Sequence, residues 1–440
     1  MNTNTAPLGW FGIVRLGLVQ TALGSIVVLT TSTLNRVMVV ELALPAILPG
    51  TLIAVHYAMQ VLRPCLGHSS DLGGRRTPWI VGGMAVLAIG GSLAAVATAL
   101  MGTYLIPGLA LAVVAFILIG IGVGATGTTL LVLLAARADP SRQAAAATVV
   151  WVMMLGGFVI TATTAGHLLD PFSPTRLVVI SSANSVAALL LTLLAVRGLE
   201  GTVPPSSLSR GSTAISFVAA LSEVWAEPKA RRFAIFVFVS MLAYSAQDLI
   251  VEPFAGTVFG FTPGETTKLA GTQHAGVLIG MLTAGALGGA RLGSMHAWTI
   301  GGCVGSAAAL VGLATAAIAA PSWPLRVTVL AIGFANGIYA VATIGSMMAL
   351  VGAGRESRHG VRMGLWGAAQ AIAFGLGGFA GTLASDIARY ILRQPSTAYA
   401  TVFVGEAILF IVSAVMAALI HRADSRPTET GPGPTFQIAA

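Results

Sequence analysis

Long apolar runs constrain this chain more than any other feature of its sequence. Runs of about 20 predominantly apolar residues recur from end to end, and a helix of that length crosses the roughly 30 Å hydrocarbon core of a bilayer. Only 9% of the 440 residues are charged, against about 25% in a typical soluble protein. The sequence therefore predicts an all-α membrane protein with twelve transmembrane helices. The expected spans are 11–34, 43–65, 78–101, 105–135, 144–169, 176–197, 231–252, 266–290, 296–320, 324–352, 362–388 and 397–421.

The longest interval between spans divides the chain into two sets of six helices. We expect an N-terminal six-helix half at 1–197, a cytoplasmic linker at 198–230 and a C-terminal six-helix half at 231–421. The remaining residues, 422–440, are polar and contain Pro and Gly. This composition is typical of a disordered tail, and we expect it on the cytoplasmic side.

The placement of Arg and Lys predicts the orientation. With both termini on one side, 17 of the 23 Lys and Arg residues fall on that side and 6 on the other. Cytoplasmic loops carry the excess of positive charge in membrane proteins, so we expect both termini in the cytoplasm. The same pattern explains the net charge of +8 by topology, and no nucleic-acid partner is expected.

The loop between the second and third spans reads GHSSDLGGRR over residues 67–76. Its glycines permit a tight turn, and its Asp can pair with an Arg or with a helix N-terminus. The loop resembles the signature of the major facilitator superfamily. That resemblance implies the superfamily fold and a loop that latches one half against the other, whereas the alternative is an ordinary basic cytoplasmic loop. The matching positions are Gly67, Asp71, Gly74, Arg75 and Arg76.

An internal repeat supports this interpretation. An offset of 218 residues places Gly67 on Gly285 and His56 on His274, although the second copy of the loop lacks the Asp. Transporter halves of this kind are parallel repeats. A neutral imidazole can ligate a metal or relay protons, so both histidines could be ligands to the magnesium of a bound chlorin. The alternative is that each is an ordinary hydrogen-bonded residue. No site for a free metal ion is expected.

Ionisable side chains inside a membrane are costly and are functional candidates by default. Glu41 and Glu252 fall at the expected outer ends of the first and seventh helices. Either they form a pigment- or substrate-binding site between the halves, or they are interface residues that bond Arg36 or a helix end. Glu406, inside the twelfth span, is given no role. The full set of candidates at this site is Asn35, Arg36, Glu41, Gln247, Asp248 and Glu252.

Motifs of the common enzyme classes are missing from the sequence. There is no Walker A motif, no dinucleotide fingerprint after a strand and no G-x-S-x-G elbow. The two cysteines, Cys65 and Cys303, have neither the spacing of a zinc site nor the position expected of a structural disulfide. We therefore expect a protein that is not an enzyme and that has no firmly assigned cofactor.

Three runs resemble a narrower family, PucC/LhaA, also called the bacteriochlorophyll delivery family. They are LNRVMVVELALPAILPG (34–50), HYAMQVLRPCLGHSSDLGGRRTPWI (56–80) and AQDLIVEPFAGTVFGFTPGET (246–266). The resemblance implies a multi-pass protein of the cytoplasmic or intracytoplasmic membrane of a photosynthetic bacterium. It also implies a role in assembling light-harvesting complexes or in bacteriochlorophyll biosynthesis. The implied partners are the lipid bilayer, antenna polypeptides, and bacteriochlorophyll or its synthase.

Within that family, a shorter branch has been called a bacteriochlorophyll synthase chain, and the length of this chain fits that branch. The Asp-rich motifs of a prenyl-transferring chlorophyll synthase are absent from the sequence. On this interpretation bacteriochlorophyll is cargo. One alternative is a proton-coupled small-solute transporter in which Glu41, Asp248 and Glu252 are the coupling carboxylates. A membrane enzyme of pigment synthesis is a third hypothesis.

Overall fold

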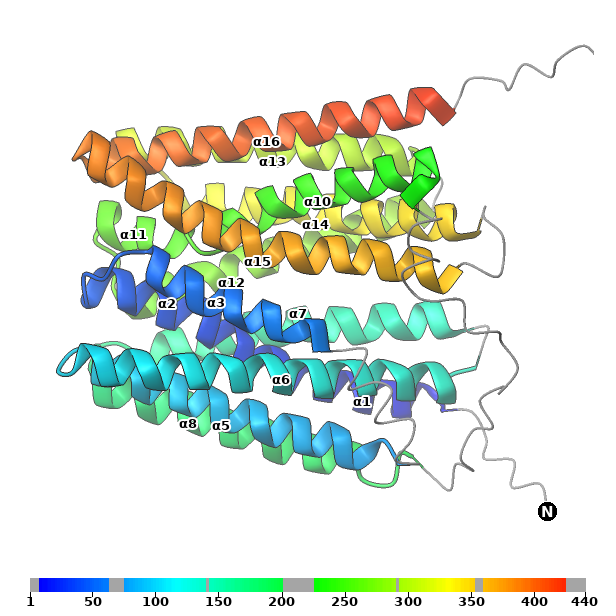
Figure 1. Ribbon diagram of the computed structural model, residues 1–440, viewed down its shortest axis with the longest axis horizontal. Coiled ribbons are helices and arrows are strands. Elements are labelled where there is room, and N and C mark those ends of the chain that lie inside the picture. The colour runs from blue at the N-terminus through cyan, green and yellow to red at the C-terminus, as the bar shows by residue number, and fades with distance from the viewer. Residues whose placement is uncertain are drawn as a thin grey trace, which may run out of the picture.

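The computed structural model describes residues 8–62, 75–139, 142–200, 225–289, 293–352 and 359–424. Helices are the only regular secondary structure within these ranges, and they run side by side along the long axis of the molecule (Figure 1). Ten of the described helices are long and apolar enough to cross a membrane. The shorter α3 and the more polar α12 complete the predicted set of twelve, so the predicted fold class is confirmed.

The first six spans form one half of the bundle. The first span is a continuous helical run, Trp10–Glu41, that consists of α1 (Trp10–Val28), the π-helical turn η1 (Leu29–Thr33), α2 (Leu34–Arg36) and the π-helical turn η2 (Val37–Glu41). The others are α3 (Ile47–Met59) with the short η3 (Gln60–Leu62), α5 (Thr77–Met101), α6 (Leu105–Arg137), α7 (Gln143–Leu168) and α8 (Pro174–Val196).

The last six spans form the other half. The seventh span has two pieces, α10 (Pro228–Asp248) and α11 (Val251–Phe259). The others are α12 (Pro263–Gly289), α13 (Met295–Ala319), α14 (Leu325–Gly352), α15 (His359–Leu392) and α16 (Pro395–Asp424).

Most boundaries agree with the predicted ones within about four residues, but the first and seventh spans differ. The prediction ended the first span at residue 34 because polar residues follow, whereas the helix continues to Glu41. The seventh span, predicted as one helix over 231–252, breaks after Asp248 and resumes at Val251. The break follows from Pro253, since a proline in a helix interior removes one backbone hydrogen bond and clashes with the preceding turn.

Each half has its own apolar core. One cluster of buried side chains comes from the first six spans together with Leu249, and a second comes from α10 to α16. Between the halves, α7 packs against α12, and α3 packs against α15. Large apolar side chains also cover much of the outer surface, as expected for helices that face lipid.

Polar contacts join the halves at the end of the bundle opposite the termini. Asp170, just after α7, accepts hydrogen bonds from Thr262 Oγ1 at 3.1 Å and from the backbone N–H of Gly264 at 3.3 Å. Asp386 of α15 accepts the backbone N–H groups of Ala46 and Ile47 at 3.0 and 2.8 Å, at the N-terminus of α3. The described contacts therefore close this end of the molecule.

Part of the predicted loop motif lies outside the described residues. This applies to Gly67, Asp71 and Gly74, whereas Arg75 and Arg76 are described. The backbone N–H of Arg76 and that of Thr77 (2.9 Å) donate to the two carboxylate oxygens of Glu200. Sequence reasoning gave Glu200 no role, yet it caps the N-terminus of α5 and ties the end of the sixth span to the start of the third.

Much of the predicted linker and tail also lies outside the described residues, namely 201–224 and 425–440. The helices reach slightly further than predicted. Helix α10 begins at Pro228, inside the predicted linker, and α16 continues to Asp424, three residues into the predicted tail. Which side of the membrane the termini face stays a prediction.

Candidate functional site

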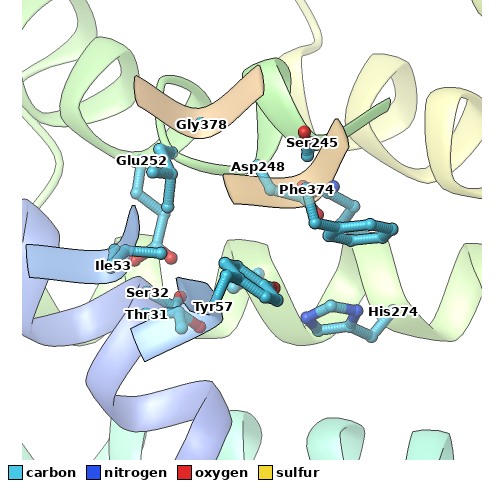
Figure 2. A pocket seen from close by; sticks show the side chains of 13 residues that line it. Thr31, Ser32, Ile53, Tyr57, Ser245, Asp248, Glu252, His274, Phe374 and Gly378 are labelled. Atoms are coloured by element: carbon cyan, nitrogen blue, oxygen red, sulfur yellow. Dashed lines mark hydrogen bonds between the residues drawn. The ribbon is translucent and has the colours of Figure 1, made fainter. Parts of the chain in front are cut away.

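A small cavity of about 60 Å³ lies between the two halves, where the seventh span breaks (Figure 2). Its walls come from both halves and combine polar with apolar side chains. The lining residues are Thr31, Ser32, Ile53, Tyr57, Ser245, Asp248, Leu249, Glu252, Ala270, Gln273, His274, Phe374 and Gly378.

Two carboxyl groups flank the break. Asp248 is the last residue of α10, and its Oδ1 accepts a hydrogen bond from Gln273 Nε2 at 2.7 Å. Glu252 lies in the first turn of α11 and is 3% exposed. Its Oε2 has no hydrogen-bond partner among the residues that the structure describes. The break thus brings two acidic side chains, four positions apart, to one cavity.

His274 lies across the cavity on α12 (Figure 2). Its ring centroid lies 4.8 Å from that of Phe158 on α7. Within the described part of the chain, its Nδ1 has no hydrogen-bond partner. Tyr57 of α3 and Phe374 of α15, 5.6 Å apart between ring centroids, meet beside it. Aromatic rings from opposite halves therefore form one wall of the cavity.

Asn35 and Arg36 lie beside the cavity without lining it. Asn35 Nδ2 donates to the carbonyl of Leu249 at 2.8 Å, directly at the break. Arg36 donates to the carbonyl of Phe261 at 2.6 Å and forms an ion pair with Glu41. Glu41 is therefore bound to Arg36, which is the alternative that the sequence left open for it.

Two further candidates lie away from the cavity lining. Gln247 is fully buried, and neither amide atom has a hydrogen-bond partner among the described residues. His56 is buried in α3, where its Nε2 lies 3.0 Å from Gln60 Nε2 and its ring lies edge-on to Tyr57. Of the repeat-related histidines, only His274 lines the cavity.

Sequence reasoning missed the neutral members of the lining, chiefly Thr31, Ser32, Tyr57, Ser245 and Gln273. The sequence prediction considered only ionisable groups inside the spans, so it did not include hydroxyl and amide side chains. The run of hydroxyl residues at 30–33 in the first span and the Gln next to His274 are the signals that could have found them.

The size and chemistry of the cavity limit what it can hold. One water needs about 10–15 Å³ measured in this way, so about 60 Å³ accommodates a few waters or a very small solute. A chlorin macrocycle does not fit. In the described ranges, no cluster of three or more His, Cys, Asp and Glu side chains could hold a metal ion. The two carboxyl groups and the imidazole can still exchange protons with water.

Comparison with known proteins supplies the family. The sequence profile described as "PUCC protein" matches residues 33–425. The chain belongs to the PucC family. This confirms the family that the three sequence runs indicated.

Two relatives from Rhodobacter capsulatus illustrate the range of the PucC family. The "Bacteriochlorophyll synthase 44.5 kDa chain" is 54% identical over 415 residues, which cover 93% of this chain and 95% of that protein. "Protein PucC" is 29% identical over 437 residues, covering 94% and 93% respectively. The protein is thus a multi-pass membrane protein whose relatives come from photosynthetic bacteria.

Solved transporter structures share the fold of this PucC-family chain. A bacterial homologue of the lysosomal transporter Spinster, inward-facing and unoccupied, has a TM-score of 0.69 at 16% identity, covering 94% of this chain and 96% of that one. A POT family transporter has a TM-score of 0.70 at 13% identity, covering 94% and 97%. At such low identity the likeness shows the major facilitator fold alone.

Proposed function

We propose that the protein binds bacteriochlorophyll within the membrane and delivers it during the assembly of light-harvesting complexes or during bacteriochlorophyll biosynthesis. One observation carries this proposal: 54% identity, along almost the whole chain, to a relative whose name links it to bacteriochlorophyll. The proposed location is the cytoplasmic or intracytoplasmic photosynthetic membrane. The proposed partners are antenna polypeptides and the enzyme that supplies the pigment.

The small volume of the central cavity supports delivery of the pigment over an outer face of the protein. A large apolar pigment needs an apolar cleft of several hundred Å³, whereas the central cavity has a volume of about 60 Å³. Apolar side chains such as Ile160 and Ile318 are well exposed on the outer surface. A pigment that moves laterally through lipid meets that surface first.

We also propose that the protein acts without catalysing a reaction itself. The transporter fold and the missing motifs of enzyme classes support this, although one relative is named as a synthase chain. The check is to incubate the purified protein with chlorin precursors. Conversion of a precursor by the pure protein would overturn the proposal.

Deletion of the gene tests the assembly role. The membranes of the deletion strain and of a strain complemented with the wild-type gene are scanned in the near infrared. We expect selective loss of one antenna band in the deletion strain and its return on complementation. An unchanged spectrum would contradict the assembly role.

A second candidate function, a proton-coupled small-solute transporter, rests on Asp248 and Glu252 at the same inter-half cavity. Carboxyl groups inside a membrane are characteristic of proton relays. Uptake into proteoliposomes is measured for the wild type, Glu252→Gln and the matched control Glu41→Gln. This candidate expects uptake that collapses in Glu252→Gln and persists in Glu41→Gln, because Glu41 pairs with Arg36 away from the cavity lining.

A further inference from the structure

A recess of about 580 Å³ lies at the end of the bundle opposite the termini, between the turn that leads into α3 and the junction of α15 with α16 (Figure 1). Its walls come from both halves of the molecule. The turn contributes Ala43, Leu44 and Pro45, and the junction contributes two arginines, Arg389 and Arg393. The recess shares no lining residue with the central cavity.

The recess holds more positive than negative charge. Arg389 and Arg393 are four positions apart at the end of α15, so they share one face of the helix. Asp386 lines the same recess, but its two carboxylate oxygens already accept backbone N–H groups at the start of α3. Arg389 also lies near the buried hydroxyl of Tyr399. The charge of the two guanidinium groups is therefore only partly offset by their surroundings.

Other cations at this end of the molecule have carboxylate partners. Arg36 forms an ion pair with Glu41, and Lys268 Nζ lies 4.0 Å from Asp170 Oδ2. In the described ranges, neither arginine of the recess forms an ion pair. The predicted topology puts six of the 23 Lys and Arg residues at this end, and two of the six converge on one recess without an ion-pair partner.

The backbone of Arg393 is a second, independent observation. Helix α15 ends at Leu392, and Arg393 follows it with a φ of 54°, its N–H donating to the carbonyl of Arg389 at 3.0 Å. Glycine usually occupies this left-handed position at a helix end, because a side chain there is strained. Glycine does so after α11, where Gly260 has a φ of 71°. An arginine at this position indicates that its side chain is kept despite the strain.

The facing wall has the same feature. Ala43, in the turn before α3, has a φ of 51°. Among the residues that the structure describes, Ala43 and Arg393 are the two other than glycine with a positive φ, and both line this recess. Strained backbone is concentrated at functional sites, including those that clamp ligands.

An ordinary helix-end role does not explain Arg393. A basic side chain near a helix C-terminus interacts favourably with the helix dipole, and an arginine near the end of a span reaches toward water. Either neighbour of Arg393, the exposed Leu392 or Gln394, could carry an arginine for these purposes with a negative φ. The strained position is needed only if the guanidinium must enter the recess.

The surroundings of the recess indicate an anion that comes from the membrane. Tyr390 lines the recess and is 86% exposed, and its neighbour Ile391 is 68% exposed. Exposed tyrosines are typical of the membrane–water interface, where the phosphate groups of phospholipids lie. Guanidinium groups match the geometry of phosphate with paired hydrogen bonds.

We propose that this recess binds a phosphate group, which Arg389 and Arg393 hold and which the headgroup of a phospholipid in the adjacent leaflet supplies. The recess volume lies within the roughly 300–1,000 Å³ range of small-molecule sites. Because its walls come from both halves, the bound headgroup contacts both of them at the closed end of the bundle. This site is separate from pigment delivery and goes beyond it.

Equilibrium binding of a short-chain phosphatidylglycerol to the purified full-length protein in maltoside detergent tests the site. A diacylglycerol with the same acyl chains lacks the phosphate, and inorganic phosphate lacks the chains. Arg389→Gln and Arg393→Gly each remove one guanidinium group from the recess. The matched control is Arg326→Gln, because Arg326 is exposed at the start of α14 and lies outside the recess.

We expect the wild type to bind phosphatidylglycerol about tenfold or more tightly than diacylglycerol or inorganic phosphate. Arg389→Gln and Arg393→Gly should each weaken that binding about tenfold or more, and Arg326→Gln should bind like the wild type. Without lipid, Arg393→Gly should unfold at the same temperature as the wild type or higher, because glycine relieves the strain at this position.

Four results would overturn the proposal or its parts. Equal binding of phosphatidylglycerol by the wild type and both recess variants would show that the recess is not the site. Equal binding of diacylglycerol would show that the acyl chains, and not the phosphate, are recognised. Inorganic phosphate that binds as tightly as the lipid would exclude the headgroup as the source. A lipid-free Arg393→Gly that unfolds at a lower temperature would show that Arg393 is kept for the fold.

Discussion

Asn35 shows how a single side chain compensates for a break in a membrane helix. In an unbroken helix the N–H of residue 253 would donate to the carbonyl of Leu249, but residue 253 is proline and has no N–H. Asn35 Nδ2 donates to that carbonyl at 2.8 Å. Backbone polar groups inside a membrane must be satisfied within the protein, so a residue of the first span completes the seventh.

We predict that Asn35→Leu destabilises the protein by about 1–3 kcal/mol, the cost of leaving a buried carbonyl without its donor. The measurement is chemical or thermal unfolding of the purified protein in detergent. Asn184→Leu, which removes a bond of the same kind to the carbonyl of Ser25 inside one half, is the comparison. If Asn35→Leu is as stable as the wild type, the hydrogen bond from Asn35 to the Leu249 carbonyl does not stabilise the broken helix.

Glu200 makes a second residue-scale contact that depends on pH. Burial alone would raise the pKa of the Glu200 carboxyl, but the N–H groups of Arg76 and Thr77 and the charge of Arg75 hold the pKa below its ordinary value. The carboxyl therefore has a lower pKa in the folded protein than in the unfolded chain. Its stabilisation is full above the unfolded-state pKa and is lost as the pH falls through the folded-state pKa.

We predict that Glu200→Gln lowers the stability by about 1 kcal/mol near neutral pH, the usual effect of weakening a helix N-cap. The difference between wild type and variant should shrink as the pH falls into the range where Glu200 is protonated. Unfolding curves recorded from neutral to acidic pH check this. A difference that stays constant over that range would exclude the charge of Glu200 as its source.

The residues of the central site were only partly predictable. Asp248, Glu252 and His274 stand out because ionisable groups are rare in an apolar chain, and the structure brings these three to one cavity. Glu41 carries the same signal but pairs with Arg36. A sequence shows which groups are polar, but it does not show which groups pair. Glu41 pairs with Arg36, five residues earlier on an irregular helix, and that pairing depends on the fold.

At the scale of elements, the apolar runs predicted the spans well and their irregularities poorly. Helix ends such as Met101 and the start at Leu105 were predicted correctly because apolar runs stop there. The π-helical turns of the first span and the break in the seventh were not predicted. The break follows from Pro253, which the sequence shows, but hydropathy along one segment does not locate such irregularities.

Close packing of α12 against α14 depends on glycine. A Cβ at Gly337 would collide with the carbonyl of Val277, and one at Gly280 would collide with the carbonyl of Phe334. Glycine at such crossings lets the two backbones approach. We predict that Gly337→Ala destabilises the protein by about 1–3 kcal/mol through overpacking.

The matched control for Gly337→Ala is Gly301→Ala on α13, where an added Cβ meets no atom within 4 Å. Its stability should stay within about 0.5 kcal/mol of the wild type. Unfolding of both variants in the same detergent provides the comparison. Equal stability of the two variants would contradict the close approach of α12 and α14.

For the whole molecule, the two-half architecture followed from the number of spans and the longest loop, and the distribution of basic residues predicted the orientation. Thiol labelling tests that orientation after Cys65 and Cys303 have been replaced by Ala. Single cysteines are introduced at the exposed positions Ala226 and Gln394, before α10 and before α16. An impermeant reagent should label position 394 in spheroplasts and position 226 only after permeabilisation. The reverse pattern would invert the predicted topology.

At the scale of the whole molecule, the proposed function requires bacteriochlorophyll to travel over an outer face of the transporter fold. The central cavity is too small for a chlorin, whereas large apolar side chains are well exposed on the outer surface. On this proposal, the cargo stays within the membrane.

The most direct test of that account is the near-infrared absorption spectrum of the full-length protein purified from pigmented membranes in mild detergents. The proposed function predicts that bacteriochlorophyll copurifies with the protein. Pigment-free protein in every mild detergent, from membranes that contain abundant bacteriochlorophyll, would contradict it.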